Sequence, residues 1–178
     1  MDKRKVQVTV HDDMLAQAAE KGIDEFLKTV TDAVKSAIGG ELSADNMECL
    51  STSQITLLAY DILREEVMDG GFVQLIHNGN GGFIFLNPLA KIIKSWGMAD
   101  LSKLLYSGRK LYFVHHEEIE KDCSDDEFMA LFEQFPDFDE LDDTFVENEE
   151  QWTESIAIYV DNHLDDFVTV LPSAPTDN

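Results

Sequence analysis

The sequence predicts a single all-α domain of residues 1–171, with a possible short strand near the N-terminus. Apolar residues recur at helical spacing through most of the chain, whereas only Lys5 to Val10 alternates as a strand does. The length of 178 residues suits one domain with a sizeable core. No stretch approaches the ~20 apolar residues of a membrane helix, and the charged N-terminus lacks a secretory signal. We therefore expect a soluble cytoplasmic protein.

The first half of the chain is expected to contain two long helices. Residues 12–38 carry an apolar stripe that is ended by a pair of glycines. Residues 53–69 carry a second stripe, which Gly70 and Gly71 interrupt before a short apolar segment from Phe72 to Ile76. The residues that follow, 77–82, are rich in glycine and asparagine and should turn sharply.

The second half is expected to add further helices. Pro88 suits the first turn of a helix to Trp96, and residues 99–121 form another, weakened in the middle by Gly108. The segment Ser124-Asp-Asp-Glu127 has the form of a capping box. Residues 138–167 place apolar side chains on one face of a helix and acidic side chains elsewhere. Residues 172–178 are expected to be a flexible tail.

Charge is distributed unevenly along the chain. Residues 1–110 hold 12 basic and 15 acidic residues, whereas residues 111–178 hold one basic residue, Lys121, and 21 acidic ones. An acidic surface repels nucleic acid and anionic membranes, and it attracts basic proteins or cations. The candidate partner-binding residues are acids of the C-terminal helix: Asp139, Glu140, Asp142, Asp143, Glu147, Glu150, Glu154, Asp161 and Asp165.

The spacing of these acids is comparable with that of nucleic-acid phosphates. Residues 137–167 carry 12 acids, and a helix of that length spans about 46 Å at 1.5 Å per residue. The mean of roughly 4 Å per charge is close to the ~3.4 Å per phosphate along one DNA strand. The alternative is an acidic face that only keeps the protein soluble. The lack of interleaved lysines, which would stabilise a helix through i,i+4 pairs, argues against that alternative.

The other candidate motifs favour structural roles. Cys49 and Cys123 are too few for a disulfide scaffold and are expected to be free thiols. The adjacent His115 and His116 point in different directions on a helix, and the glycine-rich loop lacks the Gly-Lys-Ser/Thr ending that binds phosphate. We predict no metal, no cofactor and no catalytic residue, while an enzyme with an unrecognised site stays open as an alternative.

The segment from Glu66 to Gly81 resembles the signature of the DNA-mimic protein family, Glu-Val-x-Asn-Gly-Gly-Phe-x-Gln-(aromatic)-x-x-Asn-Ser-x-Gly. These are small acidic bacterial proteins with a domain otherwise of unknown function. The matching residues are Glu66, Val67, Gly70, Gly71, Phe72, Gln74, Asn78 and Gly81. The chain departs from the signature at Asp69, Leu75 and Gly79, where the family has asparagine, an aromatic residue and serine. The similarity extends over residues 53–167 and leaves residues 1–50 unmatched.

The resemblance implies a mostly helical fold in which the nearly neutral signature is structural. One member of the family has an acidic surface that occupies the DNA-binding site of a helix-turn-helix repressor, and the resemblance implies a similar surface here. We therefore predict an acidic, DNA-mimic-like protein that occupies the basic nucleic-acid-binding surface of a partner such as a transcriptional regulator. The alternative is an immunity or adaptor-type acidic module for a partner that does not bind DNA.

Overall fold

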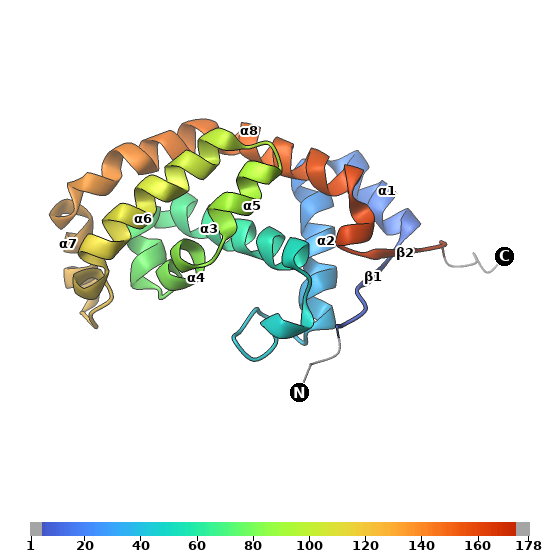
Figure 1. Cartoon of the computed structure of the whole chain (residues 1–178), viewed down its shortest axis with the longest axis horizontal. Coiled ribbons are helices and arrows are strands. Elements are labelled where there is room, and N and C mark those ends of the chain that lie inside the picture. The colour runs from blue at the N-terminus through green and yellow to red at the C-terminus, as the bar shows by residue number, and fades with distance from the viewer. Residues whose placement is uncertain (1–4, 174–178) are drawn as a thin grey trace. The chain divides into compact units, whose positions relative to one another are not determined.

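A computed structural model of the chain describes residues 5–173, and most of these residues are helical (Figure 1). The described part holds eight α-helices and one small sheet, so the predicted all-α fold is confirmed. The chain divides into two compact units, the first formed by the residues up to 58 together with those from 153 onward, and the second by residues 59–152. Helices α3 (Thr52–His77) and α8 (Asp139–Asn162) contribute residues to both units.

The first unit begins with two helices where the sequence predicted one. Helix α1 (Asp12–Lys21) and helix α2 (Ile23–Ala37) are separated by Gly22, whose φ of 126° lies where residues with a side chain are rarely found. The apolar stripe continues on both sides of the break, because Leu15 and Phe26 are both buried. The prediction of one continuous helix over residues 12–38 is therefore wrong at Gly22.

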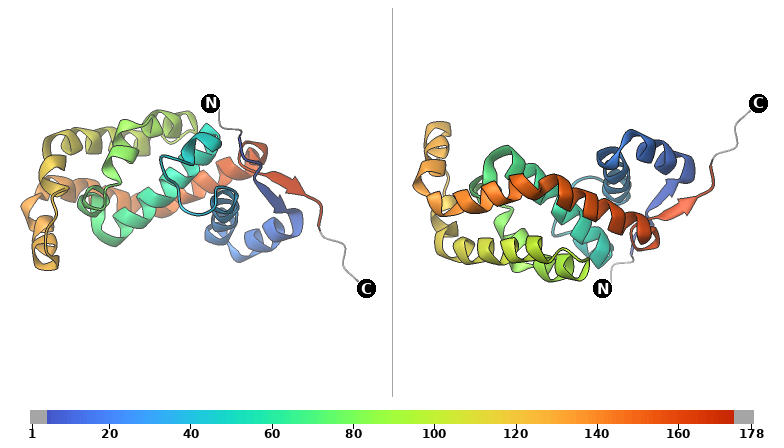
Figure 2. Two further views of the ribbon diagram at one scale, coloured as in Figure 1. Left: turned by 90° about the horizontal axis from the view of Figure 1, so that it is seen from below. Right: turned by 90° about the horizontal axis from the view of Figure 1, so that it is seen from above.

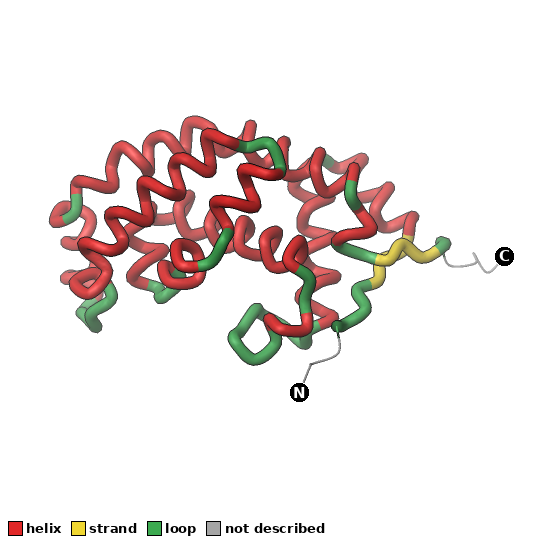
Figure 3. The backbone as a smooth tube through the Cα atoms, viewed as in Figure 1, coloured by secondary structure: helices red, strands yellow, loops and turns green. Residues whose placement is uncertain are grey.

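The same unit also contains a two-stranded parallel sheet (Figure 3). Strand β1 (Thr9–His11) pairs with strand β2 (Thr169–Leu171), with Val10 opposite Val170. The alternation that predicted a strand over Lys5 to Val10 thus marks a real strand, although it starts later and ends one residue beyond. Strand β2 was not predicted, since three residues are too few for alternation to be recognised.

The C-terminal end follows β2 directly. The ring of His11 in β1 makes a 2.9 Å hydrogen bond through Nδ1 to the carbonyl oxygen of Pro172. Pro172, the first residue of the predicted tail, thus contacts β1, and residues 174–178 of that tail lie outside the described residues.

The second unit packs its helices around a cluster of aromatic rings. Helix α6 (Ala99–Ile119) lies against α5 (Leu89–Ser95) and α4 (Gly81–Leu86). The Phe72 ring lies 6.1 Å from that of Phe85 and 6.3 Å from that of Phe145, centroid to centroid. All three phenylalanines are buried, so this cluster is the centre of the unit's core.

Helix α3 is kinked at the glycine pair, as the sequence predicted. Gly70 has φ −151° and Gly71 has φ +73°, and neither value is helical. The helix resumes from Phe72 to His77, where the sequence indicated only a short apolar segment. The turn that follows is shorter than expected, because α4 already begins at Gly81.

The remaining helices follow the sequence prediction closely, with one exception. Ser124 makes the predicted capping box with Glu127 at the start of α7 (Asp125–Gln134), and η2 (Pro136–Phe138), a 3₁₀ turn, follows it. Helix α8 is shorter than predicted: it ends at Asn162 and is followed by the 3₁₀ turn η3 (Leu164–Asp166). Its 24 residues span about 36 Å rather than about 46 Å. Figure 2 shows α8 as one uninterrupted helix.

No helix within residues 5–173 is both long enough and apolar enough to cross a membrane.

Candidate functional site

Most of the predicted partner-binding acids are exposed to solvent. Eight of the nine are exposed, and all but one of these eight lie on α8. In the second unit they are Asp139, Glu140, Asp143, Glu147 and Glu150, and in the first unit they are Glu154, Asp161 and, in η3, Asp165. Asp139 and Glu140 lie in the first turn of α8, where the positive end of the helix dipole favours a negative charge.

Asp142 is the exception among the predicted acids, because it is half-buried and turned toward the protein. Its Oδ1 accepts a 2.8 Å hydrogen bond from the backbone N–H of Phe72, just beyond the kink of α3. Burial, followed by the nearby charges of Asp139 and Asp143, raises the pKa of Asp142 to about 6, against the opposing effect of the Phe72 N–H. This carboxyl group therefore belongs to the fold rather than to the exposed acidic surface.

Glu149 is a second inward-facing acid, and it was not among the predicted residues. It is buried and forms an ion pair with the guanidinium of Arg64 on α3. Asp142 and Glu149 share the inner face of α8 with the buried Phe145 and Trp152, at steps of three and four residues. The helical period could therefore have separated these two acids from the exposed ones.

Residues within the signature segment form a hydrogen-bonded cluster around the carboxylate of Glu66. The side-chain amides of Gln74, Asn78 and Asn80 donate to it at 3.1, 2.9 and 3.1 Å. Gln74 also donates to Asp69 at 2.8 Å. The cluster thus joins the two halves of α3 to the turn that follows, which supports the structural role predicted for the signature.

Three glycines of the signature are required by close packing. A Cβ atom at Gly70 would collide with the Gln74 side chain, and one at Gly71 with the Asp142 carboxyl. A Cβ atom at Gly81 would lie 2.6 Å from the Tyr112 ring. Together with the positive φ of Gly71, these contacts explain why the kink needs glycine.

The sequence model of the protein family described as "DMP19-like protein" matches residues 48–163, which include the signature and α8. The chain belongs to the DMP19-like protein family. The DNA mimic protein DMP19 of Neisseria meningitidis serogroup B is 35% identical over 127 residues, which cover 71% of this chain and 77% of the relative. The resemblance inferred from the signature is thus confirmed. Helices α1 and α2 lie outside the segment that matches the DMP19-like family.

The surroundings of Cys123 in this DMP19-like chain do not favour nucleophilic catalysis. Its Sγ lies 4.0 Å from Nε2 of His77, whose Nδ1 is 2.7 Å from the carbonyl oxygen of Ile119. Burial, then the charges of Glu127 and nearby aspartates, raises the pKa of the Cys123 thiol. A nucleophilic cysteine requires the opposite shift, toward the thiolate.

The adjacent histidines of α6 point to separate partners, as the sequence indicated. Nε2 of His115 lies 3.2 Å from a carboxylate oxygen of Asp137, and Nδ1 of His116 lies 3.3 Å from one of Glu120. Among residues 5–173, no group of three or more potential ligands converges on a point where a metal ion could bind.

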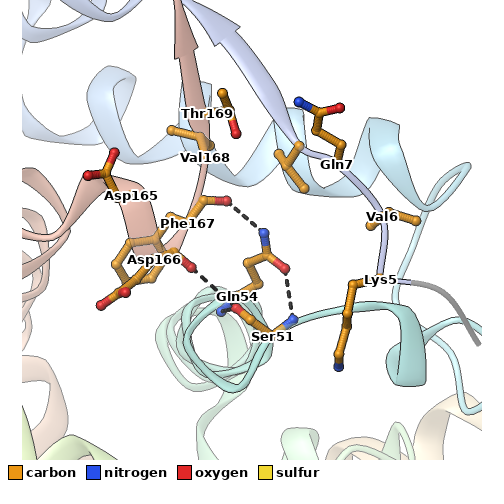
Figure 4. A pocket seen from close by; sticks show the side chains of 11 residues that line it. Lys5, Val6, Gln7, Ser51, Gln54, Asp165, Asp166, Phe167, Val168 and Thr169 are labelled. Atoms are coloured by element: carbon orange, nitrogen blue, oxygen red, sulfur yellow. Dashed lines mark hydrogen bonds between the residues drawn. The ribbon is translucent and has the colours of Figure 1, made fainter. Parts of the chain in front are cut away.

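A hollow of about 380 Å³ lies beside the sheet of the first unit, and the side chains of Gln54 and Ser51 that line it are hydrogen-bonded within the fold (Figure 4). The Gln54 side chain donates to the carbonyl oxygen of Phe167 at 2.7 Å and accepts from the N–H of Ser51 at 2.8 Å. The Ser51 hydroxyl donates to the carbonyl oxygen of Asp166 at 3.2 Å. These hydrogen bonds tie the start of α3 to the segment that leads into β2.

Proposed function

We propose that this protein is a DNA mimic whose exposed carboxylates on α8 occupy the basic nucleic-acid-binding surface of a partner, such as a transcriptional regulator. The observation that carries the proposal is the exposure of five acids within residues 139–150. No lysine or arginine follows Lys121 in the sequence, so no basic side chain from this part of the chain can neutralise them. The similarity to a protein named as a DNA mimic supports the same function.

The arrangement of these acids suits a surface that binds arginine and lysine. Asp143 and Glu147 are four residues apart and Glu150 follows after three, so the side chains emerge on neighbouring turns of one helix face, about 5–6 Å apart at Cβ. Like charges at that spacing destabilise an isolated helix. The inward contacts of Phe145 and Trp152, both buried, offset this cost and hold the acids in place.

The experiment that tests the proposal is a competition between DNA and this protein. A basic partner would be captured from the native source at about 0.1 M salt, where exposed charges still interact over ~10 Å. It would then be titrated with a labelled DNA duplex and the full-length chain. We expect the protein to displace the duplex, because both ligands would use one basic surface. A stable ternary complex would overturn the proposal and favour an acidic module for a surface that does not bind DNA.

Charge-reversal variants identify the surface. The triple variant Asp143→Lys, Glu147→Lys, Glu150→Lys should need on the order of tenfold more protein for half-displacement, or more. The matched control reverses three exposed acids of the same unit that belong to α3 and α6: Glu65, Glu117 and Glu118. It changes the net charge equally, so equal losses in both variants would show that net charge, and not the α8 surface, governs binding.

A further inference from the structure

An apolar groove of about 320 Å³ lies on the first unit, between the junction of α1 with α2 and the C-terminal part of α8. Ala19, Gly22 and Phe26 line one side, and Ala157 lines the other. Two isoleucines of the groove remain accessible, with Ile23 at 40% and Ile158 at 56% exposure. The break at Gly22 forms part of the groove, because it ends α1 and starts α2 at this point.

The groove is framed by negative charge. Glu154 and Asp161, both exposed, line it from α8, one turn before and one turn after Ile158 on the same helix face. The segment 19–26 that lines the opposite side carries three exposed acids and one exposed base: Glu20, Asp24, Glu25 and Lys21. An apolar centre with an acidic rim is complementary to an apolar side chain flanked by arginine or lysine.

Ile158 is informative because a surface that copies the spacing of phosphates would carry an acidic residue at this position. The sugar-phosphate backbone presents charge at regular intervals, so a surface selected only to imitate it would not need an isoleucine between Glu154 and Asp161. Half of the groove also comes from α1 and α2, which lie outside the segment 48–163 that matches the family. Half of the groove's lining therefore lies outside the part of the chain that matches the family.

We propose that this groove docks a basic segment of the partner protein through one apolar side chain that has arginine or lysine neighbours. This second proposal rests on the proposed function only in assuming that the partner is a basic protein. The apolar contact contributes binding free energy that salt does not screen. The same contact allows the protein to distinguish its partner from other basic surfaces. Exposed charges are screened by salt, whereas burial of an apolar side chain is not weakened by it.

The test uses the full-length chain and two synthetic helical peptides of equal length and equal positive charge. One peptide carries a leucine between lysines, and the other carries serine in its place. Binding would be followed by fluorescence anisotropy at about 0.1 M and about 0.5 M salt, the second being enough to screen most surface attraction. We expect both peptides to bind at low salt and only the leucine peptide to bind at high salt. Equal salt dependence of the two peptides would overturn the proposal.

Two matched variants locate the contact on the protein. Ile158→Glu adds a charge within the groove, and Val146→Glu adds one at a residue of α8 that is 53% exposed and does not line it. If charge alone governs binding, both variants should bind the leucine peptide as well as the unaltered protein or better. We expect Ile158→Glu instead to weaken high-salt binding by roughly tenfold, as the loss of a buried anchor does, and Val146→Glu to leave it unchanged. No loss in Ile158→Glu, or an equal loss in both, would contradict the proposal.

Two further measurements keep the result interpretable. Ile23→Glu changes the opposite wall and should reproduce the loss, and thermal unfolding would show whether each variant is folded. Methyl resonances of Ile23 and Ile158 should shift when the leucine peptide is added, and shifts confined to other methyl groups would place the contact elsewhere. The outcome is separable from the proposed function, because the α8 triple reversal tests displacement of DNA while Ile158→Glu tests salt-resistant binding.

Discussion

Phe72 belongs to the aromatic cluster at the centre of the second unit's core. It is fully buried, and its ring packs against those of Phe85 and Phe145. We expect Phe72→Ala to lower the free energy of unfolding by about 3–5 kcal/mol, because it leaves a cavity among rigid rings. Urea denaturation measures this change. The control is Val114→Ala on the exposed face of α6, which should change the free energy of unfolding by less than about 0.5 kcal/mol.

The opposite outcome for Phe72 would change the interpretation of the signature. If Phe72→Ala kept the stability of the native chain and abolished partner binding, the signature would be a binding site. The hydrogen bonds that converge on Glu66 favour the structural role.

Asp142 should make stability depend on pH. Its pKa is raised to about 6 in the folded protein from an ordinary value of 3.8, so the folded state binds this proton more tightly than the unfolded chain does. The resulting stabilisation is fully present below about pH 4 and is lost as the pH rises through about 6. Asp142→Asn keeps an acceptor for the Phe72 N–H and cannot ionise. We expect the variant to gain about 1–2 kcal/mol relative to the native chain between pH 4 and pH 7, after allowance for solvent screening.

The measurement for Asp142 is a series of urea unfolding curves across that pH range. Glu150→Gln is the control, because it removes an exposed carboxylate of the same helix that is not among the causes of the raised pKa of Asp142. The gain from Asp142→Asn should grow between pH 4 and pH 7 by more than any change seen in this control. A gain that does not depend on pH would show that the Asp142 carboxyl group titrates normally.

Among the helices, α7 has the most explicit start signal. The Ser124 hydroxyl accepts from the N–H of Glu127, and the Glu127 carboxylate accepts from the N–H of Ser124. We expect Ser124→Ala to destabilise α7 by about 1 kcal/mol, since one backbone donor loses its partner. Amide hydrogen exchange in residues 125–134 should then speed up severalfold. Ser107→Ala, at an exposed position inside α6, should leave exchange in α7 unchanged.

A helix or strand could be predicted from the sequence when many of its residues follow the pattern typical of that element. Helix α6 follows from many apolar positions, and its predicted bounds agree with the structure within about two residues. Helix α7 begins at the predicted capping box. Gly22 was missed because one glycine inside a helical pattern is usually tolerated, and only its backbone angles show the break. Strand β2 is defined by its pairing with a distant segment, which local sequence does not record.

For the whole molecule, the uneven charge distribution was visible in the sequence, whereas the details of the acidic surface required the fold. Eight of the nine predicted acids proved to be exposed. The helical period separates Asp142 and Glu149 from the exposed acids, but only the fold shows that they contact Phe72, 70 residues from Asp142, and Arg64. The groove beside Ile158 could not be predicted either, since it needs α1 and α2 to lie against α8. Composition thus predicted an acidic surface, and packing determines which of its side chains are exposed.

The net charge of −23 should act mainly on how fast the partner is found. Complementary charges raise the rate of encounter, and they are screened within about 8–10 Å near physiological ionic strength. We therefore expect the association rate constant with a basic partner to fall steeply as salt rises, while the dissociation rate constant changes little. Stopped-flow measurements over a series of salt concentrations would give both constants.

The triple reversal of Asp143, Glu147 and Glu150 should lower the association rate and flatten its salt dependence, whereas Ile158→Glu should raise the dissociation rate if the groove holds an apolar side chain. An association rate that does not depend on salt would mean that the acidic surface does not guide the encounter, and mimicry of DNA would then lose its physical basis.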